Sequence, residues 1–114
     1  MSMSLEFSPP TTSLPPLVFF DRPELDRLLR LYGRMVAMGD WKDYAINGGV
    51  EAATFAVFRR SGDAPLYRVE KRPELARRQG TWSVIAQGGA ILRRGHELDQ
   101  VLKVFDARRF RVVE

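Results

Sequence analysis

The chain has 114 residues, enough for one domain with a modest core and too few for a second independent domain. Apolar residues make up 45% and charged residues 28%, a mix typical of a globular protein and not of a disordered chain. There is no cysteine, which excludes disulfides, thiolate metal sites and cysteine nucleophiles. No apolar run approaches the roughly 20 residues of a membrane-spanning helix, so no membrane association is expected.

The N-terminal segment, residues 1–16, contains four prolines and no hydrophobic period, so it predicts a flexible Pro-rich arm. It lacks the basic start and continuous apolar stretch of a secretory signal, which favours a cytoplasmic location. The following apolar run, residues 17–20, predicts either a short strand or a hydrophobic staple onto the next element.

A helix is predicted to begin at Asp21, where Glu24 completes the pattern of a capping box and a proline lies in the first turn. Gly39 is its natural stop. Apolar residues repeat at helical spacing and are expected to form the buried stripe: Leu25, Leu28, Leu29, Tyr32 and Val36. The other side is interpreted as a solvated face: Arg27, Arg30 and Arg34.

Beyond Gly39 the pattern alternates and predicts strands. Residues 44–46 form a short one, closed by glycines at 48–49 that accept positive φ. Residues 54–59 and 66–71 are stronger strands, and Pro73 ends the second because it cannot donate to a ladder.

A closing hairpin is predicted from residues 82–87 and 90–94, joined by Gly88-Gly89 as a two-residue primed turn. This register pairs three positions: Ala86 with Ile91, Ile85 with Leu92 and Val84 with Arg93. Apolar residues then lie on both faces of the hairpin, whereas a sheet with one wet face should alternate cleanly. We therefore expect both faces to be covered, the second by the last helix, the arm or a second subunit.

A short final helix is predicted after the hairpin, with acids at its start and a stripe at i, i+3, i+4 and i+7: Leu98, Val101, Leu102 and Phe105. Residues 107–114 predict a basic C-terminal tail or an edge strand. The prediction is thus one α+β domain over residues 17–106, with an N-terminal amphipathic helix, an antiparallel sheet of four or five strands and a short C-terminal helix.

The charge is unevenly distributed. The whole chain carries +4, but residues 59–111 contain 13 Lys or Arg against 6 Asp or Glu, a balance of +7. This segment is a candidate surface for nucleic acid or another polyanion, although surface arginine also serves solubility. The candidate polyanion-binding residues are Arg68, Lys71, Arg72, Arg77, Arg78, Arg93 and Arg94. The densest group, Lys71-Arg72 with Arg77-Arg78, is explained equally well as a solvated connector.

Two other groups of residues have competing explanations. Trp82, Tyr67 and Phe58 could stack nucleic-acid bases beside arginines, but burial in the core is the favoured interpretation. The single histidine, His96, is interpreted as a helix-start residue. The aspartates match no cation-binding loop, and the glycine pairs lack the residues of a phosphate-binding loop. We therefore predict no catalytic residue, no cofactor and no metal site.

Several segments resemble a known family: LYGRMVA, LYRVEKRP and QGG-ILRRGH occur in order over about residues 19–105. They are similar to short alphaproteobacterial proteins classed as domain of unknown function 2794. The resemblance implies a bacterial cytoplasmic protein and carries no assigned activity, so no functional residue is transferred from it.

The leading functional hypothesis is a small non-enzymatic binding protein, regulatory in role, whose basic surface contacts nucleic acid or another polyanion. The alternative is a protein–protein interaction module or homodimer that binds no nucleic acid, motivated by the two-sided apolar hairpin. An enzyme ranks last, because one histidine and no cysteine leave little visible chemistry.

Overall fold

A computed structural model of the protein describes residues 17–60 and 62–113, with only the backbone described for 107–113. The arm predicted for residues 1–16 lies outside this range. The elements follow in the order α2 (Arg22–Ala37), β1 (Asp43–Asn47), β2 (Ala53–Phe58), β3 (Tyr67–Lys71), the 3-10 turn η2 (Pro73–Leu75), β4 (Trp82–Ala86), β5 (Ile91–Gly95) and α3 (Leu98–Val113). The predicted α+β class is confirmed.

The start and end of α2 follow from local sequence. The Asp21 carboxylate accepts from the Glu24 amide at 2.9 Å, and the Glu24 carboxylate accepts from the Asp21 amide at 2.8 Å. This capping box satisfies two amides that the first turn leaves unpaired. The helix ends at Ala37 with Met38 as its C-cap, and Gly39 follows with φ of +83°, a conformation that costs glycine little.

The buried stripe of α2 differs from the predicted one. Its buried residues are Leu28, Leu31 and Met35, while Leu29 and Val36 are exposed. The prediction was wrong for these two because α2 is apolar over a wider arc than the sheet covers. Sequence spacing shows the arc, but the contact with the sheet decides which part of it is buried.

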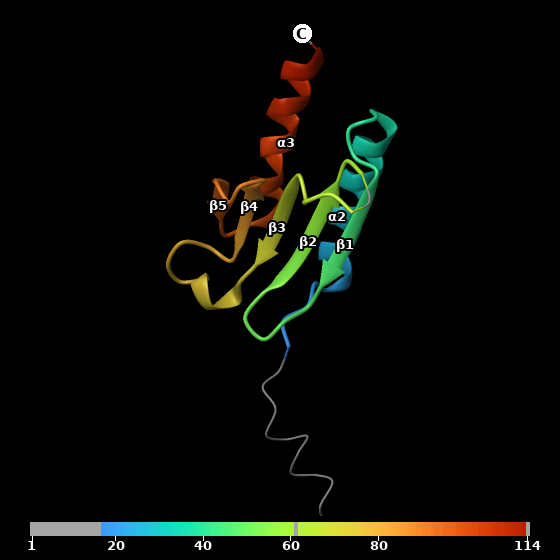
Figure 1. Ribbon diagram of the computed structural model, residues 1–114. Helices are drawn as coiled ribbons and strands as arrows, with labels where there is room; N and C mark the ends of the chain where they lie inside the picture. Colours follow the sequence, from blue (N-terminus) through green and yellow to red (C-terminus); the bar gives the residue numbers. More distant parts are fainter. Residues whose placement is uncertain (1–16, 61, 114) are drawn as a thin grey trace, which may run out of the picture.

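The five strands form one antiparallel sheet in the order β1-β2-β3-β4-β5, so each strand pairs with its neighbour in sequence. Both helices lie on the same side of this sheet, with α2 behind β1 and β2 and α3 packed on β4 and β5 (Figure 1). They contribute to one core, which contains Leu28, Leu31, Met35, Leu98, Val101 and Phe105.

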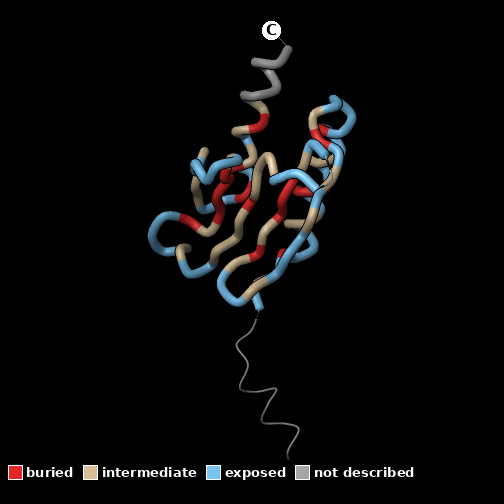
Figure 2. Tube along the Cα trace, viewed as in Figure 1, coloured by how far each residue is buried: buried red, intermediate tan, exposed pale blue. Residues whose placement is uncertain are grey.

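Aromatic rings join the two helices to the sheet. The Phe105 ring of α3 meets Trp41 edge-on at 5.3 Å and Tyr67 of β3 at 5.1 Å between centroids. Trp82 is also buried, stacked with Phe20 at 6.1 Å. Trp82 is buried and Tyr67 packs against the core, which confirms the core interpretation for these two residues. Phe58 differs, because it is half-buried and lies with Ala56 on the other face of β2. The buried positions lie along the central strands, while the connecting loops are exposed (Figure 2).

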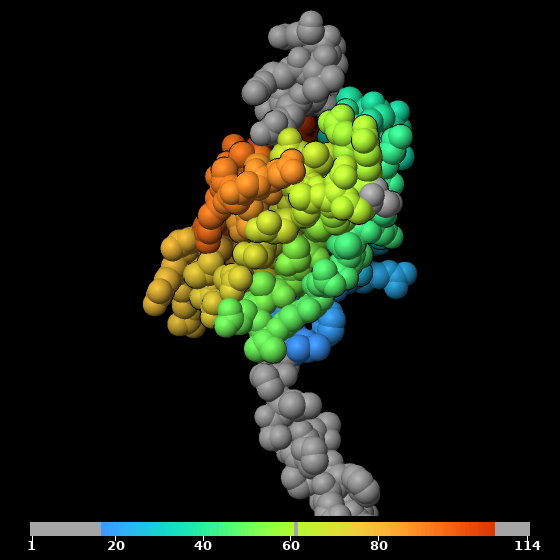
Figure 3. Space-filling view, viewed as in Figure 1, coloured from blue at the N-terminus to red at the C-terminus, as the bar shows by residue number. Residues whose placement is uncertain are grey.

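The second face of the sheet is open. No described helix or strand lies over it, and it faces the viewer in the space-filling view (Figure 3). Of the covers predicted for this face, the last helix is excluded because α3 packs on the core side, whereas the arm lies outside the described residues and a second subunit stays a prediction. Strand pairing aligns five residues across this face: Ala45, Ala56, Arg68, Ile85 and Ile91. Ile85 is nevertheless buried, and long neighbours such as Arg68 explain this because methylene stems can cover apolar surface.

The β4–β5 hairpin departs from the predicted register. Val84 pairs with Arg93 as predicted, but a bulge follows and Ile85 pairs with Ile91. The connection is longer than two residues, since the Ala86 amide donates to Ala90 and the Gly89 amide donates back to Ala86. The extra residue in β5 shifts Ile91 to the open face and leaves Leu92 packed against the core.

The two ends of the described chain compare differently with the prediction. Val18 forms an isolated bridge with Gly49, which supports the short-strand interpretation of residues 17–20. At the other end α3 continues through residues 107–113, where the sequence predicted a tail or an edge strand.

Gly80, in the β3–β4 connection, lies close to the backbone at Gly95, and a substitution there tests this close approach. Gly80 has φ of +108°, and an added Cβ would collide with the backbone of Gly95. We expect Gly80→Ala to lower the free energy of unfolding by about 3 kcal/mol, from strain and overpacking together. Urea denaturation followed by circular dichroism measures this loss.

Gly88→Ala is the matched control, because Gly88 has φ of +95° but nothing within 4 Å of an added Cβ. It should cost only the conformational strain, about 1–2 kcal/mol. Equal losses for the two variants would contradict the close approach at Gly80.

Candidate functional site

The seven predicted polyanion-binding residues do not form one patch. Arg68 and Arg94 lie on the open face, on opposite sides of β4, and Arg77 and Arg78 are exposed in the β3–β4 connection. The other three, Lys71, Arg72 and Arg93, hold contacts within the fold.

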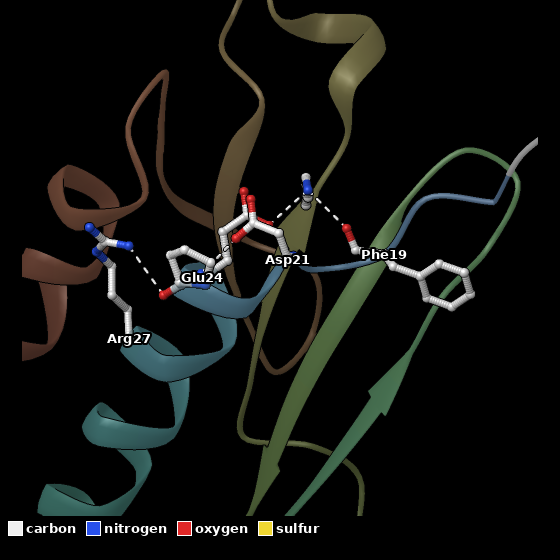
Figure 4. Close-up of polar contacts among 6 residues, drawn as sticks. Phe19, Asp21, Glu24 and Arg27 are labelled. Carbon is white, nitrogen blue, oxygen red and sulfur yellow. Dashed lines mark hydrogen bonds and ion pairs between the residues drawn. The ribbon is translucent and has the colours of Figure 1, made fainter.

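Lys71 ties β3 to the start of α2. Its ammonium donates to the Phe19 carbonyl and to the Glu24 carboxylate, both at 2.8 Å (Figure 4). The same Glu24 oxygen serves the capping box at Asp21, and the ammonium lies 5.9 Å from the centre of the Trp82 ring. Lys71 is therefore a structural residue and has little charge left for a ligand.

Arg72 is surrounded by carboxylates. It lies 3.4 Å from Glu70, 3.0 Å from Glu51 and 3.6 Å from Glu74. The hydrogen bond that Arg72 donates to the Glu70 carboxylate is the main cause that raises the pKa of Arg72 above its usual value. Three carboxylates surround one guanidinium, so the charge around Arg72 is negative. The run Lys71-Arg72 in the sequence had suggested a positive charge there.

Arg93 faces the helix side of the sheet. Its guanidinium donates to the Gln100 carbonyl at 3.0 Å and so holds β5 against the first turns of α3. The predicted patch thus reduces to two separated pairs, Arg68 with Arg94 and Arg77 with Arg78.

A different basic surface lies between the two helices. We call it the interhelical groove, and it has a volume of about 230 Å³. Its lining residues are Arg27, Arg30, Leu31, Arg34, Asp99, Leu102, Lys103 and Asp106. The three arginines, predicted only as a solvated face, are exposed and also line this groove.

Two ion pairs cross the groove. Arg27 contacts Asp99 at 3.1 Å, and Arg34 contacts Asp106 at 3.5 Å. Seven residues separate the two arginines on α2 and the two aspartates on α3, which is two helical turns on each. The helices therefore run parallel and in register. Such exposed pairs add little stability, but they define the two ends of the groove.

Between these pairs the groove is cationic on both sides. Arg30 lies between Arg27 and Arg34 on α2, and Lys103 lies between Asp99 and Asp106 on α3. Neither Arg30 nor Lys103 has a hydrogen bond or ion pair to any residue that the structure describes. Leu31 and Leu102 add apolar lining. We call Arg30 and Lys103 the middle pair, and together they offer two unneutralised cations to an anion.

A second depression, of about 250 Å³, lies next to the groove where both helices begin. Its lining includes four acids, Asp21, Glu24, Glu97 and Asp99, and the histidine His96. No group of three or more potential metal ligands comes together in the described part of the chain. The depression is acidic, so the two neighbouring hollows have opposite electrostatic character.

Comparison with known proteins places the chain in a family. A family model described as "Protein of unknown function (DUF2794)" matches residues 18–102. The chain belongs to the DUF2794 family. This confirms the resemblance seen in its sequence motifs, and no curated protein or solved structure matches. The DUF2794 match includes Arg27, Arg30, Arg34 and Asp99 and ends directly before Lys103.

Among the described residues, no helix is long and apolar enough to cross a bilayer.

The sequence of this DUF2794 chain did contain a signal for the groove. Arginines seven apart on the first helix match aspartates seven apart on the last, Asp99 and Asp106. The signal was missed because the two helices are more than sixty residues apart, and only the sheet between them sets them side by side.

The structural role of Lys71 can be tested directly. Lys71→Met removes two charge-assisted hydrogen bonds and should lower the free energy of unfolding by about 2 kcal/mol. Arg77→Met removes an exposed cation and should change it by less than about 0.5 kcal/mol. Chemical denaturation measures both, and a Lys71 variant as stable as the Arg77 variant would show that these contacts are not formed.

Proposed function

We propose that this DUF2794 protein is a small non-enzymatic binding protein, regulatory in role, that holds a phosphate-bearing polyanion in the interhelical groove. Nucleic acid is the polyanion we favour. The middle pair carries the proposal, because Arg30 and Lys103 line one groove and neither forms an ion pair with a carboxylate of the described residues.

Electrostatics favour an anion at this position. Two like charges that share a groove repel each other, and an anion between them replaces that repulsion with two attractions. Arginine binds phosphate with its planar fork, and lysine acts as a point charge. The outer ion pairs keep Arg27 and Arg34 close by, so a longer polyanion would meet further cations along the groove.

The groove is a better candidate than the exposed loop arginines. Arg77 and Arg78 belong to one connection, whereas the middle pair comes from two helices anchored in one core. Binding groups held on rigid elements lose less conformational freedom when a ligand arrives. Self-association is the alternative that the sequence left open, and it is compatible with this proposal. The groove is lined only by the side of α2 that faces α3, so the other side of α2 is available for a second copy.

The proposal predicts a site-specific loss of polyanion binding. Arg30→Gln/Lys103→Gln should weaken binding of single-stranded and duplex nucleic acid about tenfold at low salt. Two phosphate contacts account for a slope of about −1.8 in log affinity against log salt, so the variant should lose about that much slope. Fluorescence anisotropy at about 50 mM and about 200 mM salt measures both quantities.

Arg59→Gln/Arg60→Gln is the control, since it makes the same change in charge at exposed residues outside the groove. It should retain most of the affinity. An equal loss in both variants would assign binding to overall charge, and no binding by the wild type at low salt would end the proposal. Heparin serves as a second probe, because it carries negative charge without bases.

A further inference from the structure

The side of α2 away from the groove has apolar residues that the fold leaves exposed. Leu29 is 38% exposed and Val36 is 41% exposed. Gly33 lies between them, and an added Cβ there would meet nothing within 4 Å. The helix therefore has a second apolar side, which the sequence predicted as part of its buried stripe and which the sheet does not cover.

The adjacent strand β1 continues this surface. Tyr44 is 38% exposed and Ile46 is 42% exposed. Their side chains lie on the helix side of the sheet, because Tyr44 contacts Tyr32 of α2 with 4.8 Å between ring centres. We call this continuous surface the apolar flank, and it consists of Leu29, Gly33, Val36, Tyr44 and Ile46.

The two edges of the sheet differ in how they are protected. The edge strand β5 carries Arg93 and Arg94, follows a bulge and packs against α3, features that oppose pairing with another strand. The edge strand β1 has one charged residue, Asp43 at its start, and an unbroken register with β2. The β1 edge is thus the less protected of the two, although its Tyr44 amide donates to the Asp43 carboxylate at 2.8 Å, and the apolar flank lies directly beside it.

We infer that the apolar flank is the interface with a second copy of this chain. The two β1 strands pair antiparallel about a twofold axis through Ala45, which extends the sheet across both copies. In that register Tyr44 of each copy lies opposite Ile46 of the other, an aromatic pair with a β-branched residue on the helix side. The surface is therefore complementary to itself, as a twofold interface requires.

The available area supports only a weak dimer. The apolar stretch of α2, from Leu29 to Val36, is about 12 Å long at 1.5 Å per residue, and helix and strand together are roughly 20 Å wide. The flank then offers about 250 Å² per copy and about 500 Å² in total, which is the size of a weak interface, so the main-chain hydrogen bonds of the paired strands must supply much of the affinity. We expect a dissociation constant in the high micromolar range.

Other occupants fit this flank less well. It contains no charged side chain, so it does not suit a polyanion, whose binding depends on cations. The open face of the sheet is a weaker choice for the second copy, because Ala56, Ser83 and Ile85 are already buried there and offer little further area. The groove lies on the other side of α2, so this inference does not depend on the proposed function.

Analytical ultracentrifugation of the full chain, from low to high micromolar concentration, tests the inference. The wild type should approach twice its 13.0 kDa mass as concentration rises. Ile46→Lys should weaken dimerisation by more than about tenfold, because it places a charge in the apolar interface. Ile46→Thr keeps β-branching and avoids a buried charge, and it should weaken dimerisation by a smaller factor.

Ile91→Lys is the matched control, since Ile91 is 50% exposed on the opposite edge strand. It should dimerise like the wild type, and circular dichroism checks that every variant is folded. A wild type that stays monomeric throughout would overturn the inference. So would folded Ile46 variants that still dimerise fully, or a dimer that Ile91→Lys dissociates.

Discussion

The arrangement of the whole molecule depends on both helices packing against the same face of one sheet. Phe105 is the contact that enforces this, because its ring meets Trp41 beyond the end of α2 and Tyr67 within the sheet. With α3 held there, Asp99 and Asp106 face Arg27 and Arg34, and the interhelical groove exists. The same packing leaves the other sheet face open and exposes the outer side of α2.

Local signals predicted much of the fold correctly. The capping box at Asp21, the stop at Gly39 and the alternation that marks each strand act over a few residues, so the sequence displays them directly. The bulge after Val84 was not predictable in this way, since the register of a hairpin also depends on which residues the core accepts. The same limit explains Leu29 and Val36, whose burial depends on where the sheet lies and not on helical spacing.

The site was harder to predict than the fold, for an electrostatic reason. A run such as Lys71-Arg72 is conspicuous in the sequence, but its charge is consumed by Glu24, Glu70 and other acids that the fold brings near. Arg30 and Lys103 are inconspicuous because each has acids in its own sequence neighbourhood. Whether a cation is free depends on three-dimensional partners, and a count of charges along the chain does not contain that information.

The two sides of α2 have different physical character, and this separation has a consequence for affinity. One side presents cations across the groove to α3, and the other presents uncharged apolar residues beside β1. A dimer formed through the apolar flank would carry two grooves in one rigid assembly. A polyanion long enough to reach both would bind the second groove at a high effective concentration, so a modest affinity at each groove would suffice for firm binding. Dimerisation in the micromolar range would then make polyanion binding depend on protein concentration, which would give the proposed binding protein a means of regulation.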